Sequence, residues 1–407
     1  MTMTIKSATW SNEPDLAFDM KRKAEEACRI YGEDKVINSV LGTLADDEGR
    51  IIAFPSVYKA LDDLARGEIA SYAPIEGDRD YLDKLINILF DDYKPDAYIK
   101  AVASPGGTGA IRSALWTYVD KGDPVLCHNY CWGVYQTMCQ EFGRDFRTYE
   151  FFNEDFSFNL DDLTARLDEA LGDSDRTAII INSPANNPTG YSLSDREWDL
   201  VIDLLKDRAR DKDKKLTLLV DVAYLEYAGD GKSQREFFTK FSNLPENLMV
   251  VVCFSMSKAY TAYGMRCGAA VGISSSQKAI EDFENSFTHT ARANWSNVNH
   301  APQKILVRLS QGDDLEAYKK DLEDAKDLLN KRAEVFIRET RQNDIRTIPY
   351  FGGFFAFIPT DRAFEISDKL EKDHIFVLPQ TKGLRIALCR TPARLIPDLI
   401  QGIKKYI

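Results

Sequence analysis

The feature that most constrains the fold is a regular alternation, between residues 98 and 255, of short apolar runs with stretches of helical periodicity. The apolar runs are rich in β-branched residues, which is typical of strands that are buried on both faces of a sheet. They are residues 98–103, 125–128, 178–182, 216–222 and 249–255. One helical stretch begins at Ser194 with Glu197 three residues later, the pair expected of a capping box. This alternation predicts an α/β fold with a mostly parallel sheet covered by helices.

The pattern changes near Asp313, where apolar residues recur every three, four or seven positions with charges between them. That spacing predicts an amphipathic helix of about 25 residues. Beyond it, residues 354–359 and 383–390 have the composition of strands, and residues 392–407 that of a closing helix. We therefore predict a large domain at residues 51–312 and a smaller α+β domain formed by residues 1–50 and 313–407.

Charge and composition exclude several classes of protein. The 64 acidic and 52 basic residues give a net charge of −12, which disfavours binding to nucleic acid or anionic lipid. No apolar run reaches the ~18 residues needed to span a bilayer, and no secretory signal is recognisable. The seven cysteines and four histidines show no zinc-ligand spacing, so we predict no metal site. We expect a cytoplasmic protein.

A lysine follows the last apolar run, in the sequence Ser255-Met-Ser-Lys258, and Gly264-Met-Arg266-Cys-Gly comes shortly after it. These polar side chains should emerge at the carboxyl edge of the sheet, where open α/β sheets bind ligands. Hydroxyls, an arginine and glycines around one lysine suit a phosphorylated cofactor with the lysine as nucleophile. A loop with a solvated lysine is the alternative interpretation.

Three further motifs lie near predicted strand ends. Ser104–Gly107 is a glycine-rich turn before a helix, and it suits an anion, but the motif lacks the ending of a nucleotide P-loop. Asn186–Gly190, taken alone, indicates an ordinary turn. Asp221 ends an apolar strand, with Tyr224 three residues later. A buried carboxylate needs a partner, and a cationic ring nitrogen would be a suitable one.

In their order and spacing, these motifs together resemble the pyridoxal-phosphate aminotransferases of fold type I, in particular the aspartate/aromatic aminotransferase group. The segments 104–112 and 291–297 support that placement, and the resemblance covers nearly the whole chain. It implies a homodimer with a mostly parallel seven-stranded sheet in the large domain, and pyridoxal 5′-phosphate as cofactor. It also implies transfer of an amino group from an L-amino acid, aspartate or aromatic, to a 2-oxo acid, with 2-oxoglutarate as the expected acceptor.

The resemblance implies a role for each residue around the cofactor ring. Lys258 would bind the cofactor covalently and then move a proton between the substrate Cα and the cofactor C4′. Asp221 would pair with the ring nitrogen and keep it protonated, so that the ring can act as an electron sink. Tyr224 and Asn187 would donate hydrogen bonds to the phenolic oxygen, and Trp132 would stack on the ring face.

The same resemblance implies residues for the phosphate and the substrate. Those expected to hold the phosphate are Gly107, Thr108, Ser255 and Arg266, with Tyr72 reaching in from a neighbouring subunit. Arg385 would bind the substrate α-carboxylate, and Gly42 and Asn187 would lie beside the substrate. Arg292 would cross from the neighbouring subunit to bind a distal carboxylate, since a guanidinium binds carboxylate in a two-pronged fork.

The sequence departs from the family pattern at Asn186, Tyr135 and residues 298–300. The family often has histidine at the first position, a histidine that supports the aspartate at the second, and Pro-Pro in the third segment. Another reaction at the same cofactor, β-elimination or β-decarboxylation, is an alternative because one fold supports many reactions. A cofactor-binding transcription regulator is a second alternative, but the N-terminal 50 residues are too short and acidic for a DNA-binding domain.

Overall fold

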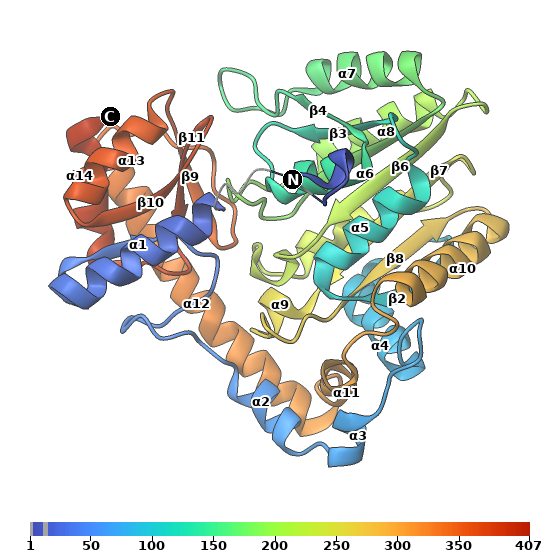
Figure 1. The fold of residues 1–407 in the computed structure, drawn as a ribbon, viewed down its shortest axis with the longest axis horizontal. Helices are drawn as coiled ribbons and strands as arrows, with labels where there is room; N and C mark the ends of the chain where they lie inside the picture. The colour runs from blue at the N-terminus through green and yellow to red at the C-terminus, as the bar shows by residue number, and fades with distance from the viewer. Residues whose placement is uncertain (1–2, 11–14) are drawn as a thin grey trace. The chain divides into compact units, whose positions relative to one another are not determined.

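The computed structural model describes residues 3–10 and 15–407, which fold into two compact units (Figure 1). Unit 1 comprises Met1–Ile51, Leu329–Ile348 and Phe354–Ile407, and unit 2 comprises Ile52–Leu328 and Pro349–Gly353. The predicted small domain starts at residue 313, whereas the units divide at residues 328 and 329, inside helix α12 (Gly312–Gln342). The apolar periodicity of α12 continues across this boundary between the units, so the sequence of the helix does not indicate where the boundary lies.

Unit 2 is built on a seven-stranded sheet with strand order β2-β8-β7-β6-β5-β3-β4. Its strands are β2 (Tyr98–Ser104), β3 (Pro124–His128), β4 (Asp145–Tyr149), β5 (Arg176–Asn182), β6 (Lys215–Asp221), β7 (Leu248–Ser255) and β8 (Gly268–Ser274). β8 is antiparallel to both of its neighbours, and the other pairings are parallel. The predicted mostly parallel sheet is confirmed.

The five predicted apolar runs all form strands, but β4 and β8 were not predicted from the residues. β4 has the sequence DFRTY, lies at the edge of the sheet and is only partly buried, so its pattern is weakly apolar. β8 consists mainly of glycine and alanine, which are not typical strand residues. Pairing with β7 and β2, rather than local propensity, makes it a strand.

Unit 2 also contains helices, several of which pack on the sheet. They are α2 (Pro55–Asp62), α3 (Arg66–Ala70), α4 (Arg79–Phe90), α5 (Gly106–Tyr118), α6 (Val134–Phe142), α7 (Leu160–Asp173), α8 (Asp195–Arg208), α9 (Met256–Ala259), α10 (Gln277–Asn294), α11 (His300–Arg308) and the short 3-10 helices η3 (Asp91–Tyr93), η4 (Leu225–Tyr227) and η5 (Ser233–Phe241). One apolar core joins α5, α6 and α10 to β3, β5 and β7. Ser194 and Glu197 form the predicted capping box at the start of α8.

The glycine-rich turn before α5 is shorter than predicted. Ser104 is the last residue of β2, and α5 begins at Gly106, so Pro105 alone separates the strand from the helix. Gly106 has a φ of +73°, a conformation that favours glycine, and this allows the abrupt change of direction.

Unit 1 contains a four-stranded sheet of order β1-β10-β11-β9, in which only β1 and β10 are parallel. Its elements are η1 (Lys6–Ala8), α1 (Leu16–Tyr31), η2 (Glu33–Lys35), β1 (Ile37–Ser39), the second part of α12, β9 (Phe355–Pro359), α13 (Ala363–Lys372), β10 (Ile375–Gln380), β11 (Gly383–Ala387), η6 (Ala393–Leu395) and α14 (Ile396–Tyr406). An apolar face of α1 packs on β10 through Met20, Ala24 and Phe376. The helix predicted from residue 313 is confirmed and is longer than expected, at 31 residues.

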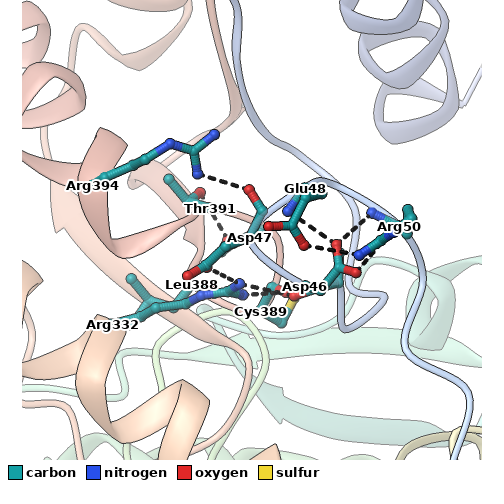
Figure 2. A network of polar contacts seen from close by, with 11 residues as sticks. Asp46, Asp47, Glu48, Arg50, Arg332, Leu388, Cys389, Thr391 and Arg394 are labelled. Carbon is teal, nitrogen blue, oxygen red and sulfur yellow. Dashed lines mark hydrogen bonds and ion pairs between the residues drawn. The ribbon is translucent and has the colours of Figure 1, made fainter. Parts of the chain in front are cut away.

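A fully buried arginine on α12 connects three segments of unit 1 (Figure 2). Arg332 Nη1 donates to the carbonyls of Cys389 (2.9 Å) and Leu388 (3.3 Å). Arg332 Nη2 donates to the Ala45 carbonyl (2.8 Å) and to Asp47 Oδ1 (2.9 Å). This charge is therefore satisfied within the unit, as a buried charge must be.

Candidate active site

The predicted lysine lies at the carboxyl end of the central strand β7. Ser255 ends β7 and caps α9, with its hydroxyl accepting a hydrogen bond from the Ser257 amide (3.2 Å). Lys258 is half-buried, and its Nζ lies 4.9 Å from the ring centroid of Tyr263 and 5.7 Å from that of Tyr224. The amine is therefore held between aromatic faces at the sheet edge where ligands bind in this fold class.

Asp221 ends the neighbouring strand β6 and is only 6% exposed. Its Oδ2 accepts a hydrogen bond from the Tyr135 hydroxyl (2.7 Å), and its Oδ1 accepts one from the Ala223 amide (3.0 Å). Burial raises the pKa of Asp221, while these two hydrogen bonds and the charge of Lys258 oppose that rise. A desolvated carboxylate of this kind is stabilised as an anion by a cationic partner.

A glycine-lined cradle lies at the start of α5. A Cβ on Gly106 would come within 2.9 Å of Arg266 Nη2, and one on Gly107 would lie 3.5 Å from the Ser255 Cβ. Arg266 Nη1 also donates to the Ser257 hydroxyl (3.1 Å). In the described structure no side chain caps the N-terminus of this 13-residue helix. Backbone amides at a helix N-terminus, a guanidinium and hydroxyls are the groups that bind phosphate.

These parts meet at one edge of the unit 2 sheet. β2 is antiparallel to β8, which is antiparallel to β7, so the carboxyl ends of β2, β6 and β7 lie at the same edge. The cradle follows β2, Asp221 ends β6 and Lys258 follows β7. A phosphate cradle, an amine and a buried carboxylate fit a ligand that carries a phosphate, a carbonyl and a basic ring nitrogen, as pyridoxal phosphate does.

Other predicted residues of unit 2 lie in the segments around this edge. Asn187, half-buried in the loop after β5, donates its amide N–H to Asn182 Oδ1 (2.7 Å). Thr108 is half-buried in the first turn of α5. The Trp132 ring lies 5.5 Å from the Tyr135 ring at an interplanar angle of 88°.

Two of the three departures from the family pattern, Tyr135 and Asn186, have specific contacts. Tyr135 occupies the position of a histidine and binds Asp221 directly, as described above. The side-chain amide of Asn186 donates to the Tyr130 carbonyl (3.1 Å) and to the Thr189 hydroxyl (2.9 Å). Asn186 therefore stabilises the turn that carries Asn187.

Two residues predicted to serve a neighbouring subunit are exposed. Tyr72 is 88% exposed. Arg292, near the end of α10, is also exposed and donates one long hydrogen bond to the Ser296 hydroxyl (3.4 Å). Neither has the buried, multiply bonded environment of a structural arginine or tyrosine.

Unit 1 holds the predicted carboxylate-binding arginine. Arg385 Nη2 donates to the Val40 carbonyl (2.7 Å), and its guanidinium carbon lies 4.1 Å above the Phe355 ring. A Cβ on Gly42 would come within 2.5 Å of Phe355 Cζ, so only glycine fits there. Gly42 and Arg385 thus lie against the same phenylalanine.

Sequence reasoning did not assign Ser257, Tyr263 or Phe355 to the site. Ser257 and Tyr263 lie between the motif residues Ser255 and Arg266, and both accept hydrogen bonds from Arg266. Their position inside the motif could have identified them. Phe355 lies in an apolar strand, where an aromatic residue ordinarily indicates core packing.

Comparison with known proteins identifies the family. The family model described as aminotransferase class I and II matches residues 34–403. The chain therefore belongs to this family, which confirms the predicted fold type, the assignment as an aminotransferase enzyme acting on amino acids and 2-oxo acids, and pyridoxal phosphate as the cofactor.

Curated relatives include an aspartate aminotransferase from Salmonella typhi, 25% identical over 79% of this chain and 81% of its own length. A tyrosine aminotransferase from Rhizobium meliloti is 25% identical over 86% of this chain and 88% of its own length. An aminotransferase structure from Anaerococcus prevotii superimposes with a TM-score of 0.99 at 58% identity, covering 100% of this chain and 99% of the other. No helix within residues 3–10 and 15–407 is both long and apolar enough to cross a membrane.

Proposed function

We propose that this aminotransferase takes its amino group from aspartate, an aromatic amino acid or both, and passes it to 2-oxoglutarate. The observation that carries the assignment of the site is the convergence of Lys258, Asp221 and the glycine cradle at one edge of the unit 2 sheet. The substrate class is supported by the relatives, which include aspartate, tyrosine and aromatic-amino-acid aminotransferases.

In the proposed mechanism, pyridoxal phosphate, when bound, supplies an electron sink for the carbanion formed at the substrate Cα. Lys258 provides the amine that attaches the cofactor, and once released it carries the proton to and from Cα. Its half-buried position beside Tyr224 and Tyr263 limits its access to water. Asp221 holds a proton on the ring nitrogen, and the anion is favoured there because it gains a cationic partner.

The cradle of Gly107, Thr108, Ser255 and Arg266 binds the phosphate in this proposal, and Asn187 and Trp132 orient the ring. Arg385 binds the α-carboxylate of the substrate with its planar guanidinium, beside Gly42. Its contact with the Phe355 ring restricts the orientation of the guanidinium, which reduces the entropy lost when a carboxylate binds. In this proposal, different residues bind the cofactor ring, the phosphate and the substrate carboxylate.

A panel of amino donors with 2-oxoglutarate tests the proposal. Each good donor should yield its 2-oxo acid and glutamate in equal amounts, with little ammonia. Production of ammonia or of a decarboxylated product without glutamate would instead identify elimination or decarboxylation at the same cofactor. The ranking of kcat/KM across aspartate, phenylalanine, tyrosine and alanine would then give the substrate class.

We also propose a homodimeric, cytoplasmic enzyme in which Tyr72 and Arg292 act in the partner's site; both residues are exposed in the single chain. Mixed dimers test this sharing. A Lys258→Ala chain and an Arg292→Leu chain, each impaired alone, should form hybrid dimers in which one site has both native residues. Activity with aspartate should therefore recover to about a quarter to a half of the wild-type level on a per-site count. Absence of recovery in verified hybrids would show that each chain uses its own Arg292.

A further inference from the structure

Residues 297–300 link the two stretches of unit 2 that carry Tyr72 and Arg292. They follow α10, which carries Arg292, and they end at the first residue of α11, which lies beside α3 and α4 (Figure 1). Most of this segment, residues 298–300, is where the chain departs from the Pro-Pro of the family pattern. A proline side chain has no hydrogen-bonding group, whereas asparagine and histidine side chains have donors and acceptors. The departure thus allows polar contacts that proline could not make.

This segment contacts the residues on both sides of Tyr72. His300 Nδ1 and Ser71 Oγ are 2.9 Å apart and share a hydrogen bond. The side-chain amide of Asn297 donates to the Ala73 carbonyl (3.1 Å). Tyr72 itself is 88% exposed. The exposed ring therefore projects from a backbone whose two neighbouring residues are both bonded to the same segment.

A second contact fixes the orientation of the His300 ring, whose side chain is only 11% exposed. Its Nε2 lies 3.2 Å from Asp78 Oδ2, and Lys304 pairs with the same carboxylate. Burial acts to raise the pKa of Asp78, but hydrogen bonds from Lys304 and His300 lower it overall, so the carboxylate is ionised and can only accept. The shared proton therefore lies on Nε2. A serine hydroxyl can donate or accept, so the Ser71 contact holds whether or not Nδ1 carries a proton.

Polar contacts are important for the stretch around Tyr72 because apolar packing holds it weakly. The five-residue helix that precedes Ser71, α3, has no buried residue in the structure as described. Ser71 and Tyr72 are exposed as well. A side chain that reaches into another subunit loses less entropy on binding when its backbone is already ordered. The contact between His300 and Ser71 provides such order where the apolar core does not.

We propose that His300 is a positioning residue that, through Ser71, fixes the backbone from which Tyr72 reaches the cofactor phosphate in the partner's site. The inference rests on the proposed function, in which Tyr72 serves that site. It predicts that loss of the contact weakens binding of the cofactor and leaves the chemical step of the loaded enzyme unchanged.

The test uses two substitutions that each keep one half of the imidazole. An asparagine side chain places a polar atom near the position of Nδ1, which faces Ser71, and a glutamine side chain places one near Nε2, which faces Asp78. The measurement is the dissociation constant of pyridoxamine 5′-phosphate, the non-covalently bound form of the cofactor, by isothermal titration. H300A and H300Q should raise it about 3- to 10-fold, whereas H300N should stay within about twofold of the wild type. With saturating cofactor, kcat should be the same in all three variants.

Lys304→Met is the matched control for a merely structural role. It removes the other partner of Asp78 and leaves the contact between His300 and Ser71 in place. K304M should lower the melting temperature about as much as H300A does, without weakening the binding of pyridoxamine phosphate. Ser71→Ala should weaken that binding as much as H300A does.

A double-mutant cycle with Tyr72→Phe separates an effect through Tyr72 from any other. In the Y72F background, H300A should have no further effect on the dissociation constant, because the hydroxyl that it positions is absent. Wild-type binding in H300A, rescue by H300Q instead of H300N, equal weakening in K304M, or additive losses in the cycle would each overturn the inference while the proposed function stands. Wild-type binding in Y72F would instead overturn the proposed role of Tyr72, and this inference with it.

Discussion

Two buried charges, Arg332 in unit 1 and Asp221 in unit 2, have opposite relations to their surroundings. Arg332 is 0% exposed, and its two Nη atoms donate to three carbonyls and to Asp47, so its charge is compensated within the unit (Figure 2). Asp221 is 6% exposed, has two neutral donors on its carboxylate, and has a raised pKa because of its burial. The charge of Arg332 is thus compensated within unit 1, whereas the carboxylate of Asp221 has only neutral hydrogen-bond donors, an environment that suits a cationic ligand.

The largest effect should follow from Lys258→Ala, which removes the amine beside Asp221. Without a nucleophile and proton carrier, kcat should fall by at least about 10⁴-fold, while the protein stays folded because the side chain is only half-buried. Steady-state kinetics and circular dichroism measure the two properties. Near-normal turnover in this variant would refute the assignment of the active site.

Removing the carboxylate of Asp221 should cause the next largest loss of activity. Asp221→Ala leaves the ring nitrogen without its anionic partner, so we expect kcat to fall by about 10²- to 10⁴-fold. Because Asp221 lacks a native counter-charge of the kind that Arg332 has, the melting temperature should change little or even rise. A loss of only a few-fold in kcat would mean that another residue pairs with the nitrogen and that Asp221 is structural.

Arg292→Leu tests an arginine that differs from Arg332 in every respect of its environment. It is exposed and makes one long hydrogen bond, so its removal should not affect stability. With aspartate, loss of the partner of the distal carboxylate should lower kcat/KM by about 30-fold or more. With phenylalanine, the loss should be far smaller. Equal losses for the two substrates would show that Arg292 does not determine specificity.

Arg332→Met should affect stability rather than chemistry. The change leaves the carbonyls of Ala45, Leu388 and Cys389 without their donor, and the free energy of unfolding should fall by about 3–5 kcal/mol, measured by urea denaturation. Arg338→Met is the matched control on the same helix, since Arg338 is 54% exposed and pairs with its neighbour Glu339. The control should lose less than about 0.5 kcal/mol. Equal losses would mean that the buried network does not stabilise unit 1.

The smallest effect concerns Asp78, a carboxylate of unit 2 that has the counter-charges Asp221 lacks. Burial acts to raise its pKa, but hydrogen bonds from Lys304 and His300 lower the pKa overall. Asp78→Asn should therefore cost about 1 kcal/mol of stability near neutral pH. A lowered pKa stabilises the fold above the unfolded value near 3.9, and that contribution is lost as the pH falls through the folded value. The difference between wild type and D78N, from urea denaturation, should thus stay constant above about pH 4, shrink below it and disappear once the pH is under the folded value.

Much of the candidate site could be predicted from the sequence because its chemistry is carried by residues close together in the chain. Ser255, Lys258 and Arg266 belong to one loop, and the polar motifs each follow a strand that its apolar residues already identify. By contrast, Phe355 required side-chain geometry, since an aromatic residue in an apolar strand ordinarily indicates core packing.

The sequence by itself determined the type of each strand and helix with strong periodicity, the order of the motifs and the family. The element types and the motifs depend on side chains that are only a few positions apart, and their spacing can be read from the sequence. Only the tertiary structure decided that β8 joins the sheet antiparallel to its neighbours and that Tyr135 binds Asp221. The same holds for Arg332, whose partners are mainly backbone carbonyls, groups that every residue carries. Contacts of this kind depend on strand order and packing between distant segments, and no local pattern of residues specifies them.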